Sequence, residues 1–217
     1  MEDLALTCYY LCNTGAITAD HLRITKYKTK TEFNGILIPS NLLDLIAIFD
    51  TPFINVKIFS GNILFYSDNI EVYGSLQYGA ENFPEDNINQ AIETSFENEC
   101  LINRNDLLEA LNRLSIYVTE KDKNGVSVQV SKYNMTITNL NTNTIEVLEI
   151  RSKNHTNDLT YEFMIDIDFW KNSISCQDCE DINLFYNGPG IKMIDDDVTY
   201  VVSLLEEEEE NTEGDLN

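Results

Sequence analysis

Basic residues are scarce in this sequence. It has 14 Lys and Arg against 37 Asp and Glu in 217 residues, so the formal net charge is -23 at pH 7. A protein that binds nucleic acid by covering the phosphates with lysine needs the opposite balance. The composition therefore argues against that mode of binding, and any contact with DNA must be topological or confined to a small basic surface.

Long apolar runs are also missing. No run of about 18 apolar residues is present, so no membrane-spanning helix is predicted. The first residues, Met1-Glu2-Asp3, are acidic where a secretory signal would be basic. We therefore expect a soluble, cytoplasmic protein with no membrane partner.

Cysteine and histidine are too few for an obvious metal site. The five cysteines form an odd set with no disulfide framework, and only Cys176 and Cys179 have CxxC spacing. A zinc site would need two further ligands, and His21 and His155 are the only histidines. Reduced thiols near a helix end are the simpler interpretation, so we predict no metal.

Catalytic motifs are absent as well, since there is no Gly-rich phosphate loop, GxSxG or HExxH. Asp166, Asp168 and Asp195 to Asp197 could in principle hold Mg²⁺ in a nuclease. Acidic clusters are expected by chance in so acidic a chain, and Asp is favoured in tight turns such as Asp195 to Asp197. We predict no enzyme, no catalytic residue and no cofactor.

What the sequence does contain is a repeat of an amphipathic helix followed by a meander of strands. The first complete copy runs from Glu32 to about Gly79, the second begins at Glu99, and the third begins with the strand Tyr161–Ile165. The predicted helices are Leu42–Phe49 after Pro39-Ser40-Asn41, Arg104–Tyr117 with Leu107, Leu108, Leu111 and Leu114 on one face, and Asp168–Ser175. The other predicted strands are Gly35–Ile38, segments around Val56, Leu64 and Val72, then Cys100–Ile102, Val126–Val130, Met135–Thr138, Ile145–Ile150, Ile182–Tyr186, Ile191–Ile194 and Thr199–Leu205.

The N-terminus carries a remnant of one more copy. Leu6–Leu11 and Ala16–Tyr27 are predicted to be two strands, without the strand and helix that open the other copies. Two such βαβββ units side by side make one compact domain. We therefore predict an α+β fold with two domains, with helices on one face of curved antiparallel sheet. The predicted boundaries are 1–82 for the first domain, 83–98 for a linker, 99–205 for the second domain and 206–217 for a disordered acidic tail.

The polar sides of the three helices are candidate binding surfaces. They carry Asn41 on the first helix, Arg104, Asn105, Asn112 and Arg113 on the second, and Lys171 and Asn172 on the third. For a single helix, a solvated face is the simpler interpretation. In a repeated architecture the three faces would line one common surface.

Several short motifs, in their order and spacing, resemble the DNA polymerase sliding clamps, specifically the bacterial β-clamp and the two-domain bacteriophage clamps. Thr18-Ala-Asp-His-Leu-Arg23 is similar to the family's TDGHRL, and Phe83-Pro-Glu-Asp86 to the end of its GRFPDY. Asn105-Asp-Leu-Leu-Glu-Ala-Leu111, through Glu120-Lys121 to Gly125-Val126, is similar to its LLxAL…SNEKxxGVRL, and Tyr200-Val-Val202 to its closing YVV. The resemblance covers most of residues 6 to 205.

The resemblance implies a DNA-clamp fold and a ring with helices lining its bore around duplex DNA. Such a ring tethers the replicative polymerase without sequence recognition, and it has a clamp loader as a second partner. The helix residues Arg104, Asn105, Asn112, Arg113, Lys171, Asn172 and Asn41 would then face DNA. The resemblance also implies a hydrophobic pocket for partner peptides, carried onto Thr18, His21, Leu22, Val201, Val202, Leu204 and Leu205.

The sequence departs from the family pattern at specific positions. Asp20 and Leu22 replace the family's glycine and arginine in TDGHRL, and Ser40-Asn41 replaces a basic pair that some members carry. Lys26, Lys28 and Lys30 form a second basic run, either a solvated loop or a contact at the rim of the ring.

Six domains complete a family ring, so a two-domain chain implies a homotrimer. A fragment of a three-domain clamp would instead form a dimer. The alternative function is that of an acidic DNA mimic that inhibits a nucleic-acid enzyme. The mimic predicts carboxylates concentrated on one face, whereas the clamp predicts the few cations on the helix side.

Overall fold

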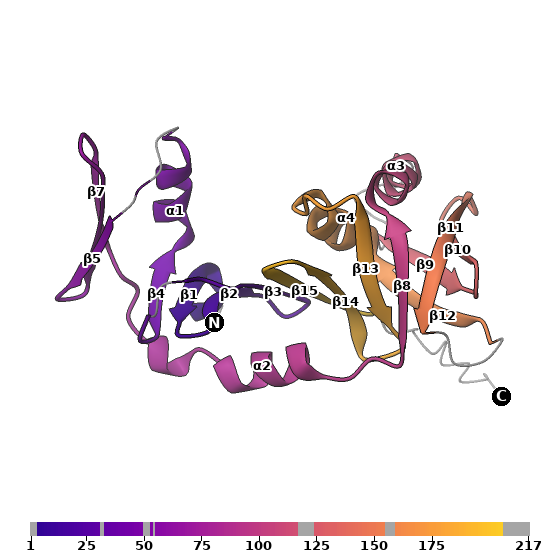
Figure 1. The fold of residues 1–217 in the computed structure, drawn as a ribbon, viewed down its shortest axis with the longest axis horizontal. Coiled ribbons are helices and arrows are strands. Elements are labelled where there is room, and N and C mark those ends of the chain that lie inside the picture. The colour runs from indigo at the N-terminus through magenta and orange to yellow at the C-terminus, as the bar shows by residue number, and fades with distance from the viewer. Residues whose placement is uncertain are drawn as a thin grey trace, which may run out of the picture. The chain divides into compact units, whose positions relative to one another are not determined.

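The computed structural model describes residues 4–30, 33–49, 53, 55–116, 124–154 and 159–205. The chain divides into two compact units. The first comprises Met1–Thr94 and Asp196–Val201, and the second comprises Ser95–Asp195 and Val202–Asn217. Figure 1 labels the elements of each unit. The division at Thr94 lies inside the predicted linker, and the domain boundaries themselves remain a prediction.

The second unit holds one complete copy of the predicted repeat and most of another. Its strands are all paired antiparallel, in the order β12-β9-β10-β11-β8-β13-β14. The first copy is β8 (Asn98–Asn103), α3 (Arg104–Ser115), β9 (Gly125–Val130), β10 (Asn134–Asn139) and β11 (Ile145–Asn154). The second copy is β12 (Tyr161–Asp166), α4 (Ile167–Ser175), β13 (Asp181–Tyr186), β14 (Gly190–Asp195) and β15 (Val198–Ser203), whose residues are divided between the two units.

Helices α3 and α4 lie side by side over this sheet (Figure 1). Each helix buries one apolar stripe, comprising Leu107, Ala110, Leu111 and Leu114 on α3 and Ile167, Trp170 and Ile174 on α4. Alternate residues of β9, Val126, Val128 and Val130, are fully buried, because a strand presents every second side chain to one face. The predicted α3 stripe is corrected at one position, since Ala110 is buried and Leu108 is only half-buried.

Side-chain caps define the starts of α3 and α4. Asn103 accepts the amides of Asn105 and Asp106 at 3.0 and 3.1 Å. Asp166 accepts the amides of Asp168 and Phe169 at 2.9 and 3.0 Å. Each side-chain oxygen satisfies amides that have no partner inside the helix. The sequence placed α4 one residue late and extended α3 to Tyr117, which lies outside the described residues.

The first unit contains two antiparallel sheets. One has the order β3-β2-β1-β4 and the other β5-β6-β7. Their strands are β1 (Cys8–Cys12), β2 (Gly15–Ala19), β3 (Arg23–Tyr27), β4 (Ile36–Pro39), β5 (Asn55–Phe59), β6 (Asn62–Tyr66) and β7 (Glu71–Ser75). The helical segments are η1 (Leu4–Thr7), α1 (Ser40–Ala47), η2 (Ala80–Asn82) and α2 (Glu85–Glu93). Pairing of β4 with β1 repeats the pairing of β12 with β9, so the first unit follows the same plan.

Two helices of the first unit belong to different apolar clusters. Leu42 of α1 packs with Ile38, whereas Ile88 of α2 packs with Tyr10 and Leu37. Because Leu37 and Ile38 are consecutive in β4, the two clusters lie on opposite faces of the strand. Within the second unit α3 and α4 share one face, as predicted, whereas in the first unit α2 is an unpredicted helix on the face opposite to α1.

Helix α2 forms in the segment that the sequence predicted as a plain linker. Pro84 precedes its first turn, where Glu85 and Asp86 carry the negative charge that a helix N-terminus favours. Tyr10 holds this end, since its ring stacks on Phe83 at 4.3 Å and its hydroxyl donates to Glu85 at 2.8 Å. Burial, with that hydrogen bond, raises the pKa of Tyr10 to about 12.

The predicted N-terminal strands need correction. Leu6 lies in η1, and the segment Ala16–Tyr27 is two strands, β2 and β3, separated by a turn. The turn is made by Asp20, whose Oδ1 accepts the amides of Leu22 and Arg23 at 2.8 and 2.7 Å. An aspartate that binds the backbone two and three residues ahead favours a turn over continued strand. In α1 the helix covers Ser40–Ala47, so Phe49 lies beyond its end.

Replacing Leu111 by Ala should lower the free energy of unfolding of the second unit by about 2–5 kcal/mol. Leu111 lies in the fully buried stripe of α3, so truncation of its side chain leaves a cavity. Urea denaturation followed by the fluorescence of Trp170, the single tryptophan, measures the effect in this unit. Leu140→Ala is the control, since Leu140 is 47% exposed and its truncation should cost less than about 0.5 kcal/mol. Equal effects of the two substitutions would contradict this assignment of the core.

Candidate nucleic-acid interface

The outward sides of α3 and α4 bring together six of the seven predicted DNA-facing residues. Asn105 and Asn112 on α3 and Asn172 on α4 are exposed. Arg104, Arg113 and Lys171 complete the set on the same two helices. Asn41 is exposed on α1, in the first unit, and is described there by itself.

Arg113 is paired with carboxylates of its own unit. Its Nε and Nη2 donate to the two carboxylate oxygens of Glu146 on β11, at 2.8 and 3.0 Å. Its Nη1 also lies 3.6 Å from Glu109, one turn earlier on α3. The hydrogen bond from Arg113 lowers the pKa of Glu146, and the same bond raises the pKa of Arg113. A bidentate arginine–carboxylate pair is among the stronger polar contacts in proteins.

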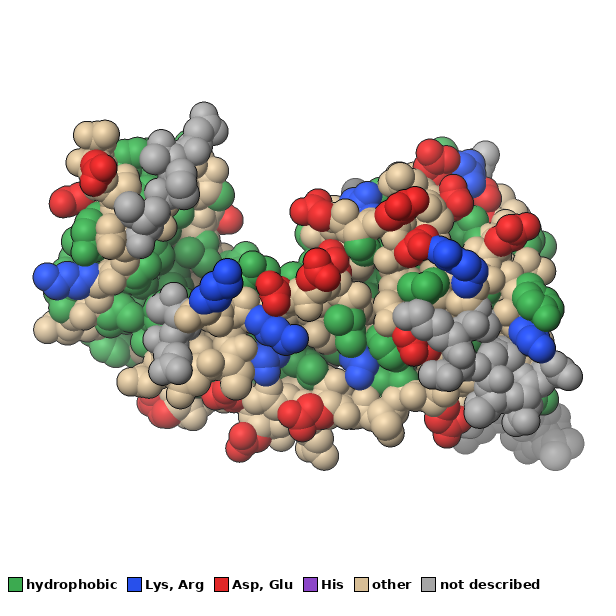
Figure 2. Space-filling model, viewed as in Figure 1, with side chains coloured by type: hydrophobic (Ala, Val, Ile, Leu, Met, Phe, Trp, Pro, Cys, Tyr) green, Lys and Arg blue, Asp and Glu red, His purple; other side chains and the backbone are tan. Residues whose placement is uncertain are grey.

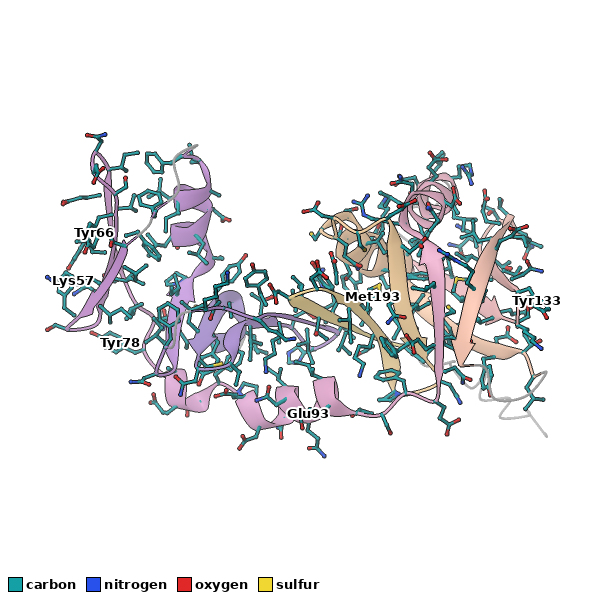
Figure 3. All side chains as sticks on the ribbon, in the orientation of Figure 1. Lys57, Tyr66, Tyr78, Glu93, Tyr133 and Met193 are labelled. Carbon is teal, nitrogen blue, oxygen red and sulfur yellow. The ribbon has the colours of Figure 1, made fainter. Side chains whose placement is uncertain are left out.

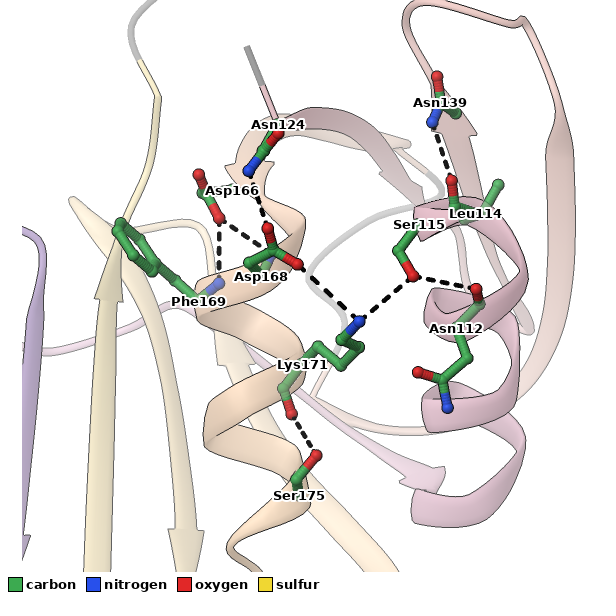
Figure 4. Close-up of polar contacts among 10 residues, drawn as sticks. All are labelled: Asn112, Leu114, Ser115, Asn124, Asn139, Asp166, Asp168, Phe169, Lys171 and Ser175. Atoms are coloured by element: carbon green, nitrogen blue, oxygen red, sulfur yellow. Dashed lines mark hydrogen bonds and ion pairs between the residues drawn. The ribbon is translucent and has the colours of Figure 1, made fainter. Parts of the chain in front are cut away.

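Lys171 is also engaged, at the junction of α3 and α4 (Figure 4). Its ammonium donates to Ser115 Oγ at 3.2 Å and lies 3.8 Å from Asp168 Oδ1. The other oxygen of Asp168 accepts Asn124 Nδ2 at 2.8 Å. This chain of contacts ties the end of α3 to the first turns of α4, and it leaves the Lys171 side chain only 25% exposed.

Arg104 binds the C-terminal end of α4. Its Nε donates to the carbonyl of Ile174 at 3.2 Å and its Nη2 to the carbonyl of Ser175 at 3.1 Å. The last carbonyls of a helix lack internal partners and carry partial negative charge, so a cation there is favourable. Arg104 therefore has a structural role on the candidate surface.

The charges of this surface nearly cancel. On α3 and α4, Arg104, Arg113 and Lys171 stand against Asp106, Glu109 and Asp168, and Glu146 of the adjoining β11 adds a fourth carboxylate. The surface is thus polar and slightly acidic. No sequence pattern indicated Glu146, because it lies on a strand 33 positions from Arg113. Only the pairing of strands brings the two together.

The aspartates considered for a metal site are used separately. Asp166 caps α4, and Asp168 binds Asn124. Asp195 accepts the amide of Asp178 at 3.1 Å. Within the part of the chain that the structure describes, no group of three or more His, Cys, Asp or Glu is placed to hold a metal ion.

The predicted partner-peptide residues of the first unit lie around one turn. Thr18 is half-buried on β2, and His21 and Leu22 are exposed between β2 and β3, with Leu22 at 40%. The departure Asp20 is what builds this turn, and its carboxylate also binds the Arg23 guanidinium at 2.6 Å. Burial opposes ionisation of Asp20, but its hydrogen bonds from Arg23 and the Leu22 amide prevail and lower its pKa.

The remaining predicted pocket residues are less exposed. Val201 is 9% exposed and belongs to the first unit, whereas Val202 is fully buried and belongs to the second. Leu204 and Leu205 are half-buried in the second unit, where the Leu205 amide donates to Met164 at 2.9 Å. The two groups of residues are described in separate units, so their joint pocket remains a prediction.

Two further features of the first unit bear on binding. Lys26 donates to Asn89 of α2 at 2.8 Å, so this member of the basic run anchors α2 and is not a free loop cation. A cavity of about 220 Å³ lies between the start of β4, the β5–β6 turn and the segment after β7. Tyr78, labelled in Figure 3, stands at this cavity with 84% of its surface exposed.

Comparison with solved structures decides the fold. A DNA polymerase III beta subunit from Eubacterium rectale matches with a TM-score of 0.79 at 19% identity, over 94% of this chain and 59% of that one. A sliding clamp from Pseudomonas aeruginosa matches with a TM-score of 0.80 at 15% identity, over 95% and 61%. The beta subunit from Thermotoga maritima gives 0.77 at 13% identity, over 95% and 60%. This chain has the sliding-clamp fold.

The chain spans about three-fifths of the length of these clamp structures. No protein-family model matches the sequence, and no curated protein does. None of the helices in the described ranges is both long and apolar enough to cross a membrane.

The Glu146 carboxylate should titrate below the ordinary range of glutamate, and Arg113→Gln should return its pKa to that range. The physical reason is that Arg113 stabilises only the ionised form. Because the folded-state pKa is lowered, the pair stabilises the fold at neutral pH, and this contribution is lost as the pH falls through that pKa. NMR of the carboxyl carbon during an acid titration measures both values. An unchanged Glu146 titration in the variant would contradict the pairing.

Proposed function

We propose that this protein is a DNA polymerase processivity factor, a sliding clamp that encircles duplex DNA. The observation that carries the proposal is the likeness of nearly the whole chain to bacterial clamps, with TM-scores of 0.77 to 0.80 over 94 to 95% of its length. The paired helices α3 and α4 supply the polar surface that would face the duplex. A topological link needs no high affinity, so it is compatible with a net charge of -23.

The proposed partners follow from this function. They are double-stranded DNA without sequence preference, the replicative polymerase and a clamp loader, in the cytoplasm of a bacterial or phage-infected cell. A partner peptide would bind at the β2–β3 turn, where Leu22 and His21 are exposed, together with Leu204 and Leu205.

Ring closure requires self-association, and strand edges are available for it. Residues 145–149 of β11 pair with β10, whereas the later part of β11 pairs with β8. This leaves one side of residues 145–149 without a partner strand in the described part of the unit. Ile145 and Val147 there are 58% and 61% exposed. In the first unit, β5 and β7 are edge strands, so one of them could extend the sheet of a neighbouring copy. Three copies would complete a ring of six domains.

The acidic-mimic alternative has less support. It requires carboxylates gathered on one face, and Figure 2 shows acidic side chains scattered among many elements on the face it presents. Three of the chain's cations, Arg104, Arg113 and Lys171, lie on α3 and α4, and this placement supports the clamp proposal.

The clamp function predicts retention on closed DNA. Protein loaded onto a circular nicked plasmid by a bacterial clamp loader should stay bound through gel filtration, because a ring cannot leave a circle without opening. Cutting the plasmid once should release it within the time of the run. Equal retention on circular and linear DNA, or retention on neither, would refute the topological link.

The self-association proposal predicts the effect of charge on β11. Ile145→Lys combined with Val147→Lys should convert a trimer into a monomer, because it places charge along the edge that would bind the next copy. Light scattering across a dilution series measures the mass. Leu159→Lys is the control, because Leu159 is 60% exposed in the same unit but lies outside the strands. A mass unaffected by the double substitution would exclude this edge.

A further inference from the structure

We propose that the α3–α4 surface binds DNA through uncharged asparagine amides, while pairing with Glu146 keeps Arg113 from binding phosphate. This inference rests on the proposed function and assigns the chemistry of its DNA-facing surface. That surface carries two kinds of side chain. The amides are exposed, whereas the cations are already bound to partners of the same unit.

The amides form a track along the helices. Asn105 and Asn112 are seven residues apart on α3, which is about two turns or roughly 10 Å along one side of the helix. Asn172 is exposed on the neighbouring α4. Each amide offers two N–H donors without net charge, so it can bind phosphate oxygens directly or through water. The Oδ1 of Asn105 already accepts Arg104 Nη1 at 3.3 Å, which leaves its two donors available. Such contacts displace no condensed cations from the DNA.

The cations contribute little in their observed state. A phosphate that approached Arg113 would have to replace the bidentate Glu146 carboxylate, an acceptor of the same charge and similar geometry. Lys171 is already bound to Asp168 and Ser115, and Arg104 is already bound to carbonyls at the end of α4. The surface therefore gains almost nothing from the counterion release that makes ordinary DNA binding strong and salt-dependent. A clamp with this surface would contact the DNA only weakly as it slides, and the strength of that contact would depend little on salt.

Glu146→Gln tests this, because it removes the closer of the two carboxylate charges that the described residues place beside Arg113 while keeping an oxygen acceptor, and leaves the exposed Glu109 at 3.6 Å. Glu149→Gln is the matched control, since it removes the same charge from the same strand. Glu149 is exposed on the opposite face of β11, because side chains alternate along a strand and Glu149 lies an odd number of residues from Glu146. NMR titration of the full chain with a 20-bp duplex, at 50 and 200 mM salt, tolerates weak binding and resolves the side-chain amides of Asn105, Asn112 and Asn172.

We expect the duplex to shift these three side-chain signals in the unaltered protein, with an affinity that changes less than about threefold between the two salt concentrations. In Glu146→Gln, Arg113 without its bidentate partner should add up to about 0.9 to the salt slope, an extra factor of up to about 3.5 over this range. Glu149→Gln should behave like the unaltered protein. Unshifted asparagine signals, or equal salt slopes in the two variants, would overturn the inference.

Retention on circular DNA separates this inference from the proposed function. If the protein stays on circles but its asparagines do not respond to the duplex, the clamp function stands and the amide track is wrong. If the protein leaves circular and linear DNA alike, the clamp function itself fails.

Discussion

Burial of the apolar stripes of α3 and α4 against alternating valines of one antiparallel sheet is the constraint on which the second unit depends. Leu111, Trp170 and Val128 have no exposed surface, so neither helix can turn without opening the core. With the apolar sides fixed, the opposite sides of both helices must face outward together. The candidate DNA surface is therefore a consequence of packing, and its residues are positioned by the core beneath them.

The electrostatics of that surface differ from what its residue types suggest. Arginine and lysine on an outward helix face normally indicate a phosphate-binding surface. Here Arg113 binds Glu146, Lys171 binds Asp168 and Ser115, and Arg104 binds the last carbonyls of α4. The cations hold the unit together, which leaves the asparagines as the groups available to a partner. Under the proposed function, such a surface favours mobility, since tight phosphate contacts would slow sliding along DNA.

Much of the fold could be predicted from the sequence because its signals are local. The Leu stripe of Arg104–Ser115 and the alternation of Val126–Val130 specify helix and strand through their periods of 3.6 and 2. The elements that were predicted wrongly also have a physical explanation. Asp20 interrupts Ala16–Tyr27 through two backbone hydrogen bonds, and α2 forms after Pro84 because Tyr10 and Phe83 anchor its start. Those stabilising partners are 75 positions apart in the case of Tyr10 and Glu85, beyond the reach of any local pattern.

By itself, the sequence determined the repeated βαβββ plan, the overall charge and the identity of the outward helix residues. These properties depend on composition and short-range periodicity, which the linear order of residues contains in full. Tertiary structure alone decided which of those residues carry free charge. Ion-pair partners such as Arg113 and Glu146 are selected by strand register and helix packing, because an interaction that decays over a few ångströms depends on distance in space and not on separation along the chain.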